Sequence, residues 1–150
     1  MFNIKRLGLA DAQKLIKGAK RKAKRIDVPM CIAVADESGN LIAFERMDGA
    51  KILSVGLSAD KAFTAAISKR PTHEYNEICQ PGNLANGIHT SSGGQFSIVD
   101  GGFPVVIRNT VVGAIGLSGG AVEQDMECAE AAVRGFLGAK AFDKRYCRTT

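Results

Sequence analysis

The stretch Val99–Gly120 constrains the fold most, because two apolar runs stand on either side of a short polar turn. The runs, Phe103–Ile107 and Val111–Leu117, are rich in β-branched residues and too short for packed helices. They predict a β-hairpin covered on both faces, since a half-solvated strand would alternate apolar and polar residues. Glycine pairs at 101–102 and 119–120 bracket the hairpin and indicate backbone that closely approaches a neighbour or a ligand.

Helix and strand patterns follow each other along the rest of the chain. Apolar residues at three- and four-residue spacings predict an amphipathic helix over residues 9–26: Leu9, Ala12, Ile16, Ala19, Ala23 and Ile26. A second hairpin is expected within Met30–Met47, with its turn at Gly39. The remaining predicted segments are helices over Ser54–Lys69, Thr72–Cys79 and Ala121–Ala141, a glycine-rich loop over Pro81–Gly94, and a short strand at Phe96–Val99.

Five strands joined mainly by tight turns, with helices around them, predict an α+β fold whose helices pack on an antiparallel sheet. A length of 150 residues favours a single domain over residues 1–150. No apolar run approaches the ~18 residues that a membrane helix needs, and the N-terminus lacks a signal-peptide pattern. The four cysteines form no C-x-x-C pair, so we expect reduced thiols and a cytoplasmic location.

The net charge of +5 raises the question of a nucleic-acid partner, because most of it lies in one segment. Seven basic residues gather there: Lys14, Lys17, Lys20, Arg21, Lys22, Lys24 and Arg25. The chain has no Trp, few aromatic residues and no stacking motif of the kind that single-strand binders use. We therefore expect a solvated helix face and no nucleic-acid partner.

Four motifs stand in the order seen in a known family: Val34–Ala50, Asp60–Ala65, Gly101–Pro104, and Gly113–Gly119 followed by Glu123-Gln-Asp125. With them nearly the whole chain resembles the GlcG/HbpS-like family, which includes the C-terminal domain of PduO-type corrinoid adenosyltransferases. One departure is Arg108-Asn109, which replaces the usual Asp-Gly pair in the central turn.

The resemblance implies a profilin-like, three-layer α/β/α domain with a five-stranded antiparallel sheet. It also implies haem binding, assembly into homo-oligomers (dimers or larger), and an accessory role in glycolate, diol or glycerol metabolism.

Haem iron needs an axial ligand, most often histidine, and the chain offers only His73 and His89. His73 is four residues before Glu77, so on a helix the two would share a face and the carboxylate could orient the imidazole. The alternative is an exposed helix pair. His89 lies in the glycine-rich loop, where it can close over a ligand or serve no role beyond that of a loop residue.

Lys61 and Thr64 belong to the second motif, and their spacing places them on one face of a helix. Lys61 is a candidate partner for a haem propionate or a small organic acid, and Thr64 a candidate hydrogen-bond donor. The alternative is structural: Lys61 pairs with Asp36 or Asp48, and Thr64 bonds its own helix backbone.

Arg46 is a further candidate for a ligand carboxylate, with a structural pair to Asp48 as the alternative. Together with the entry at Gly101 and Gly102, these residues predict a small-molecule pocket beside the second helix. No catalytic set of carboxylates, nucleophile and base, or metal ligands is recognisable, so the sequence leaves open whether the protein is an enzyme. Three hypotheses remain: a haem-binding module, an enzyme or accessory factor acting on a small hydroxy acid, aldehyde or corrinoid intermediate, and an oligomeric structural subunit without a ligand.

Overall fold

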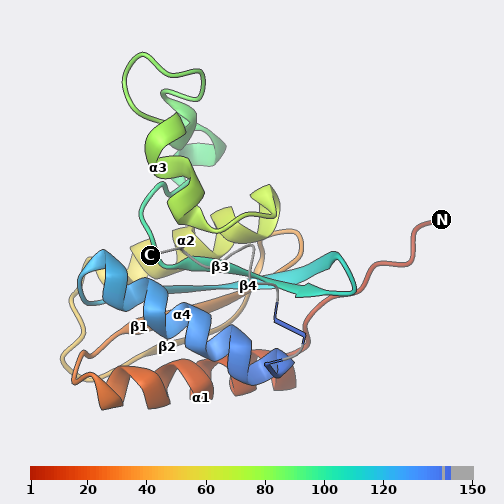
Figure 1. The fold of residues 1–150 in the computed structure, drawn as a ribbon, viewed down its shortest axis with the longest axis vertical. Coiled ribbons are helices and arrows are strands. Elements are labelled where there is room, and N and C mark those ends of the chain that lie inside the picture. The colour runs from red at the N-terminus through yellow and green to blue at the C-terminus, as the bar shows by residue number, and fades with distance from the viewer. Residues whose placement is uncertain (140, 143–150) are drawn as a thin grey trace.

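The computed structural model describes residues 1–139 and 141–142, and its centre is one antiparallel sheet in the order β2-β1-β4-β3 (Figure 1). The strands are β1 (Cys31–Asp36), β2 (Leu41–Arg46), β3 (Gly102–Ile107) and β4 (Thr110–Ser118). One face of the sheet is covered by α1 (Leu9–Arg25) and α4 (Val122–Leu137), and the other by α2 (Ser54–Ser68). The α+β class and the antiparallel sheet are thus confirmed.

The prediction of a fifth strand at Phe96–Val99 is wrong, because the described residues form four strands. Side chains from other parts of the chain form hydrogen bonds with the backbone groups that a strand would use for pairing. The N–H of Ser97 donates to Thr64 Oγ1 over 2.8 Å, and the carbonyl of Ile98 accepts from Asn76 Nδ2. The segment is therefore held by side chains and not by a neighbouring strand, and the profilin-like topology stays a prediction.

Both predicted hairpins form. Arg108 and Asn109 join β3 to β4 with φ values of 48° and 62°, the left-handed conformation that two-residue hairpin turns of type I′ require. In the β1–β2 turn, Gly39 has a φ of 86°. The Asp36 carboxylate caps this turn by accepting from the N–H of Asn40 over 2.9 Å.

The two central strands, β1 and β4, are almost entirely buried, as the continuous apolar run in β4 predicts, whereas the edge strand β2 is only partly buried. Toward α1 and α4 the sheet contributes large side chains such as Ile32, Val34 and Ile115. On the other face, the sheet and α2 pack through a layer of buried alanine side chains that both contribute: Ala33, Ala35, Ala62, Ala65, Ala66 and Ala114. The small side chains let α2 lie very close to the strands, and this closeness shapes the site described below.

Helix ends differ from the predictions by a few residues. The first helix presents Ala12, Leu15, Ile16, Ala19 and Ala23 to the core, while Leu9, predicted to be part of the stripe, is 57% exposed. The last helix ends at Leu137 and not at Ala141, because Gly138 adopts a φ of 79° and leaves the helical conformation. Cys31, Cys79 and Cys128 are buried free thiols, and Cys147 lies outside the described residues.

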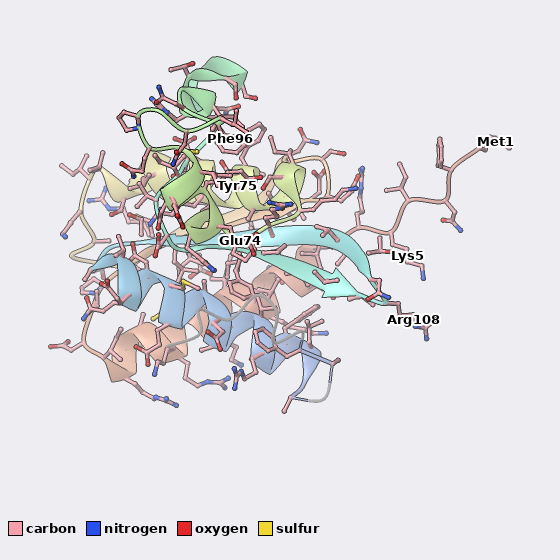
Figure 2. The ribbon with its side chains drawn as sticks, turned by 45° about the horizontal axis from the view of Figure 1, so that its top comes forward. Met1, Lys5, Glu74, Tyr75, Phe96 and Arg108 are labelled. Atoms are coloured by element: carbon pink, nitrogen blue, oxygen red, sulfur yellow. The ribbon has the colours of Figure 1, made fainter. Side chains whose placement is uncertain are left out.

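Residues 72–95, which we call the arm, stand away from the sheet beyond α2 (Figure 1). The predicted helix over Thr72–Cys79 is a 3-10 turn, η1 (Thr72–Glu74), followed by α3 (Tyr75–Ile78). Two more 3-10 turns, η2 (Ile88–Thr90) and η3 (Ser92–Gly94), lie in the segment predicted as loop. At the base of the arm, Tyr75 meets Phe96 edge to face, with ring centroids 4.9 Å apart (Figure 2).

Among the helices of the described residues, none combines the length and the apolar character needed to cross a membrane.

Candidate functional site

Lys61 is completely buried beneath the sheet-facing side of α2. Its Nζ donates to Asp125 Oδ2 and to the carbonyl of Leu117, both over 2.8 Å. Asp125 belongs to the first turn of α4, so this ion pair links the two helix layers near the end of β4. Burial lowers the pKa of Lys61 and raises the pKa of Asp125, and their mutual attraction opposes both shifts. The ion-pair partner is therefore neither Asp36 nor Asp48, the two carboxylates considered from the sequence.

Gly101 and Gly102 pack directly against Lys61. A Cβ atom at Gly101 would lie 3.0 Å from Lys61 Nζ and 2.6 Å from the carbonyl oxygen of Leu117. One at Gly102 would lie 2.5 Å from the carbonyl oxygen of Lys61 and equally close to Thr72 Cγ2. The glycine pair thus allows the backbone to pack closely against α2. Protein atoms fill the space between the second helix and these glycines, which the sequence predicts to be the entry of a pocket.

Thr64 lies one turn further along α2 and is also buried. Its Oγ1 accepts from the N–H of Ser97 over 2.8 Å and donates to the carbonyl of Gln95 over 3.3 Å. Thr72, at the other end of the arm, accepts from the N–H of Gly102 over 3.0 Å. Two threonine hydroxyls therefore fasten the two ends of the arm to the body, a role that the sequence did not reveal for Thr72.

Arg46 ends strand β2 and lies apart from Lys61, on the side of the sheet covered by α1. It borders a shallow hollow of about 350 Å³ together with Lys20, Lys24 and Asp48. Lys20 also pairs with Glu45 over 2.5 Å. The structure thus separates Arg46 from the other predicted site residues.

Both histidines lie on the arm. His73 is half-buried in η1, and His89 is exposed in η2. Glu77, the predicted partner of His73, follows in α3, so a change from 3-10 to α-helical geometry separates the two. Large apolar side chains are exposed on the same segment: Leu84 is fully exposed and Ile78 is 39% exposed. Within residues 1–139 and 141–142, no three His, Cys, Asp or Glu side chains gather into a metal-binding cluster.

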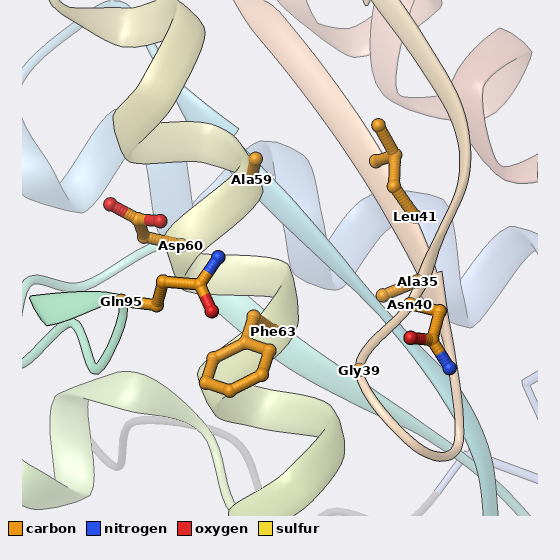
Figure 3. Close-up of a pocket in the computed structure, with 8 residues that line it drawn as sticks. All are labelled: Ala35, Gly39, Asn40, Leu41, Ala59, Asp60, Phe63 and Gln95. Carbon is orange, nitrogen blue, oxygen red and sulfur yellow. The ribbon is translucent and has the colours of Figure 1, made fainter. Parts of the chain in front are cut away.

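A cavity of about 370 Å³ opens between α2 and the β1–β2 turn (Figure 3). Its lining residues are Ala35, Gly39, Asn40, Leu41, Ala59, Asp60, Phe63 and Gln95. None of these was predicted as a site residue, although Asp60 and Phe63 lie within the second motif. The signal available in the sequence was the run of small residues in α2, which leaves room beside the helix.

Comparison with known proteins gives a consistent result. The model of the family described as haem degrading protein HbpS-like matches residues 7–134. An uncharacterized 15.0 kDa protein from the dhaT-dhaS intergenic region of Citrobacter freundii is 39% identical over 125 residues, or 83% of this chain and 88% of that protein. The chain is 32% identical over 127 residues to the corrinoid adenosyltransferase PduO of Salmonella typhimurium, of which it spans 38%.

Two solved structures share the fold along most of their length. Protein ORFY of Klebsiella pneumoniae superposes with a TM-score of 0.89 and 34% identity, over 95% of this chain and 97% of that one. PduOC, solved as a complex with haem, gives a TM-score of 0.82 and 32% identity, over 85% of this chain and 93% of that one. Since the family model also covers well over half of the chain, the resemblance found in its motifs is confirmed, and the protein belongs to the HbpS-like family.

Proposed function

We propose that this protein binds haem and that the arm supplies the iron ligand. The observation that carries the proposal is the likeness to PduOC, which was solved with haem and shares 32% of its residues and the same backbone fold. A chain with the same fold offers the same kinds of surface to a ligand, although function depends on the individual side chains.

The side chains of the arm fit this ligand. The two histidines of the chain, His73 and His89, are both on the arm, and imidazole is the most common axial ligand of haem iron in proteins. The exposed Leu84 and Ile78 offer apolar contact for a porphyrin face. Bound haem would supply redox and ligand-binding chemistry at its iron, while the protein would hold and orient the group.

The other predicted residues then act in different ways. We propose that Thr64 and Gly102 support haem binding by fixing the two ends of the arm, through Gln95 and Ser97 at one end and Thr72 at the other. Lys61 and Gly101 then act only through the buried packing next to Asp125 and Leu117. Arg46 remains available for a carboxylate because it is exposed, in the hollow next to α1.

Titration of haemin into the purified protein, followed at the Soret band, tests the function. We expect a saturable shift at micromolar haemin, lost in the His73→Ala/His89→Ala variant and retained in an Asn86→Ala control at an exposed position of the same arm. Absence of a saturable shift in the wild type would overturn haem binding. A shift unchanged in the double variant would overturn the ligation by these histidines and leave haem binding intact.

We also propose that the protein is a homo-oligomer and that it assists glycolate, diol or glycerol metabolism, as the resemblance implies. A thermal-shift panel of small hydroxy acids, aldehydes, diols and a corrinoid tests the second point, because a ligand specific for the folded state raises its melting temperature. A hit in this panel without a haem response would favour the alternative of an enzyme or accessory factor for these compounds.

A further inference from the structure

The cavity beside α2 is separate from the histidines, and its walls differ in chemistry from a haem site. Ala59, Asp60 and Phe63 form the wall on α2, and Asn40 and Leu41 form the opposite wall on the β1–β2 turn (Figure 3). Gln95, from the end of the arm, lies next to the α2 wall (Figure 3). A volume of about 370 Å³ falls within the range of cavities that hold small ligands.

Of the described residues that line this cavity, one is charged, the carboxylate of Asp60. Asp60 is half-buried, and no hydrogen bond or ion pair joins it to the part of the chain that the structure describes. Burial alone raises the pKa of its carboxyl group. A carboxylate that has lost water without gaining a partner is stabilised by any cation that enters beside it.

The remaining polar groups add no positive charge. Among residues 1–139 and 141–142, no Lys, Arg or His side chain lines the cavity. The Asn40 amide nitrogen is within 3.3 Å of both oxygens of Asp36, so it is already used in the turn. Lys61, although next to Asp60 in sequence, points to Asp125 in the core. Anionic ligands such as haem propionates are therefore disfavoured here, and cations are favoured.

Phe63 supplies an aromatic surface that is held in place. A Cβ atom at Gly39 would lie 2.7 Å from the Phe63 ring, so the turn backbone packs against this ring with no space between them. An ordered ring can bind an organic cation over its face, and the alkyl side chains of Leu41 and Ala59 can contact the apolar part of such a ligand.

We propose that this cavity is a second ligand site, specific for a small organic cation that carries an aromatic or alkyl group. Asp60 pairs with the ammonium group, Phe63 and Leu41 contact the apolar part, and Gln95 donates or accepts one hydrogen bond at the mouth. The site is independent of the proposed haem function, and it excludes the acids that the exposed Arg46 favours.

Three probes of one shape and different charge test the proposal on haem-free protein: benzylamine, benzyl alcohol and benzoate. Binding is followed by ¹H–¹⁵N NMR, with the Gln95 side-chain amide as the local reporter. We expect saturable shifts of this amide with benzylamine, binding at least about tenfold weaker for benzyl alcohol, and none for benzoate.

Variants separate the site from non-specific binding. Asp60→Asn is expected to weaken benzylamine binding at least about tenfold, and Phe63→Leu to weaken it while keeping an apolar wall. Glu77→Gln, which removes a carboxylate from α3 instead, should leave binding unchanged. Removal of a partly desolvated, unpaired charge does not oppose folding, so the Asp60→Asn spectrum should otherwise match the wild type.

Equal binding of benzylamine to wild type and Asp60→Asn, or benzoate binding as tight as that of benzylamine, would overturn the proposal. So would the absence of any response at Gln95. Because haemin is not present, these outcomes leave the haem proposal untouched, and failure of the haemin titration leaves this site untouched.

Discussion

Lys61 and Asp125 come from helices on opposite faces of the sheet and meet beside Leu117, near the end of β4. Both side chains are buried, and the carboxylate of Asp125 also accepts from the N–H of Gly120 over 2.9 Å. A buried pair of this kind adds little net stability compared with apolar residues, but removal of one partner leaves an uncompensated charge. The pair therefore acts mainly by requiring both helix layers to be in place together.

Substitution of one partner should be far more harmful than the loss of a single ion pair, because it leaves the other charge buried and uncompensated. Lys61→Met is expected to lower the free energy of unfolding by about 3–5 kcal/mol, measured by urea denaturation. Adding Asp125→Asn should restore at least about 1 kcal/mol, because the remaining amide carries no charge and still accepts from Gly120. Purely additive effects of the two substitutions would contradict this account.

The same variant should depend on pH in a defined direction. Burial raises the pKa of Asp125 and Lys61 opposes that rise, so without Lys61 the folded form binds a proton more tightly than the unfolded form. The stability lost by Lys61→Met should therefore be largest near neutral pH and should shrink as the pH falls toward the ordinary pKa of an aspartate. A deficit that grows on acidification would contradict the buried, charged state assigned to Asp125.

The sequence predicts that Lys61 and Thr64 share a helix face, but the partners that it offers for them differ from those in the structure. Lys61 and Thr64 were recognised as a pair on one helix face, and both do face inward from α2. Their contacts, Asp125 and the backbone near Ser97, lie 64 and 33 residues away along the chain. Local spacing carries no information about such distant partners, so the roles could only come from the folded chain.

At the scale of elements, the packing of α2 on the sheet depends on the absence of side chains. A Cβ atom at Gly116, in β4, would lie 2.1 Å from the carbonyl oxygen of Ser58 and 2.4 Å from the N atom of Ala62. Gly56, on the outer side of the same helix, has no heavy atom within 4 Å of the corresponding point. Position 116 thus requires glycine so that α2 can pack on β4, whereas position 56 has room for a side chain.

We expect Gly116→Ala to lower the free energy of unfolding by more than about 3 kcal/mol, since the clash is with backbone that cannot move aside. Gly56→Ala is the matched substitution and should raise stability by about 0.5–1 kcal/mol, because alanine restricts the unfolded chain and favours helix. Thermal and urea denaturation of the two variants provide the measurement. A tolerated Gly116→Ala would show that α2 can move off β4.

Elements with a strong local pattern were predicted well. The two hairpins and the three long helices follow from hydrophobic period and turn residues, which are read within a few positions. Phe96–Val99 has the composition of a strand, yet its backbone forms hydrogen bonds with the side chains of Thr64 and Asn76, which come from distant parts of the chain. The cavity next to Phe63 could not be predicted for the same reason, because its two walls come from separate elements.

At the scale of the whole molecule, a group of apolar side chains is left uncovered at the start of α2. Ile52 is 81% exposed, Leu53 77% and Val55 37%, and they follow each other closely along the chain. Exposed apolar patches of this kind mark interaction surfaces. We place the proposed contact between copies of the chain at this patch.

Sedimentation velocity tests this assignment. The wild type should sediment as an oligomer, and Ile52→Ser/Leu53→Ser should weaken association at least about 100-fold, as expected from apolar area returned to water. Leu84→Ser, at a still more exposed position on the arm, should leave the mass unchanged. A monomeric wild type at micromolar concentration, or an unaltered mass in the double variant, would rule out this contact.

The hydroxyl groups that fasten the arm also allow the sequence of the arm to change independently of the sheet. Because Thr64 and Thr72 hold the two ends of the arm without adding a strand to the sheet, residues of the arm between these ends can be replaced, inserted or deleted while every strand keeps its register. A new set of ligand-contacting side chains could therefore be built on this protein by substitutions in one protruding segment, with the sheet left as it is.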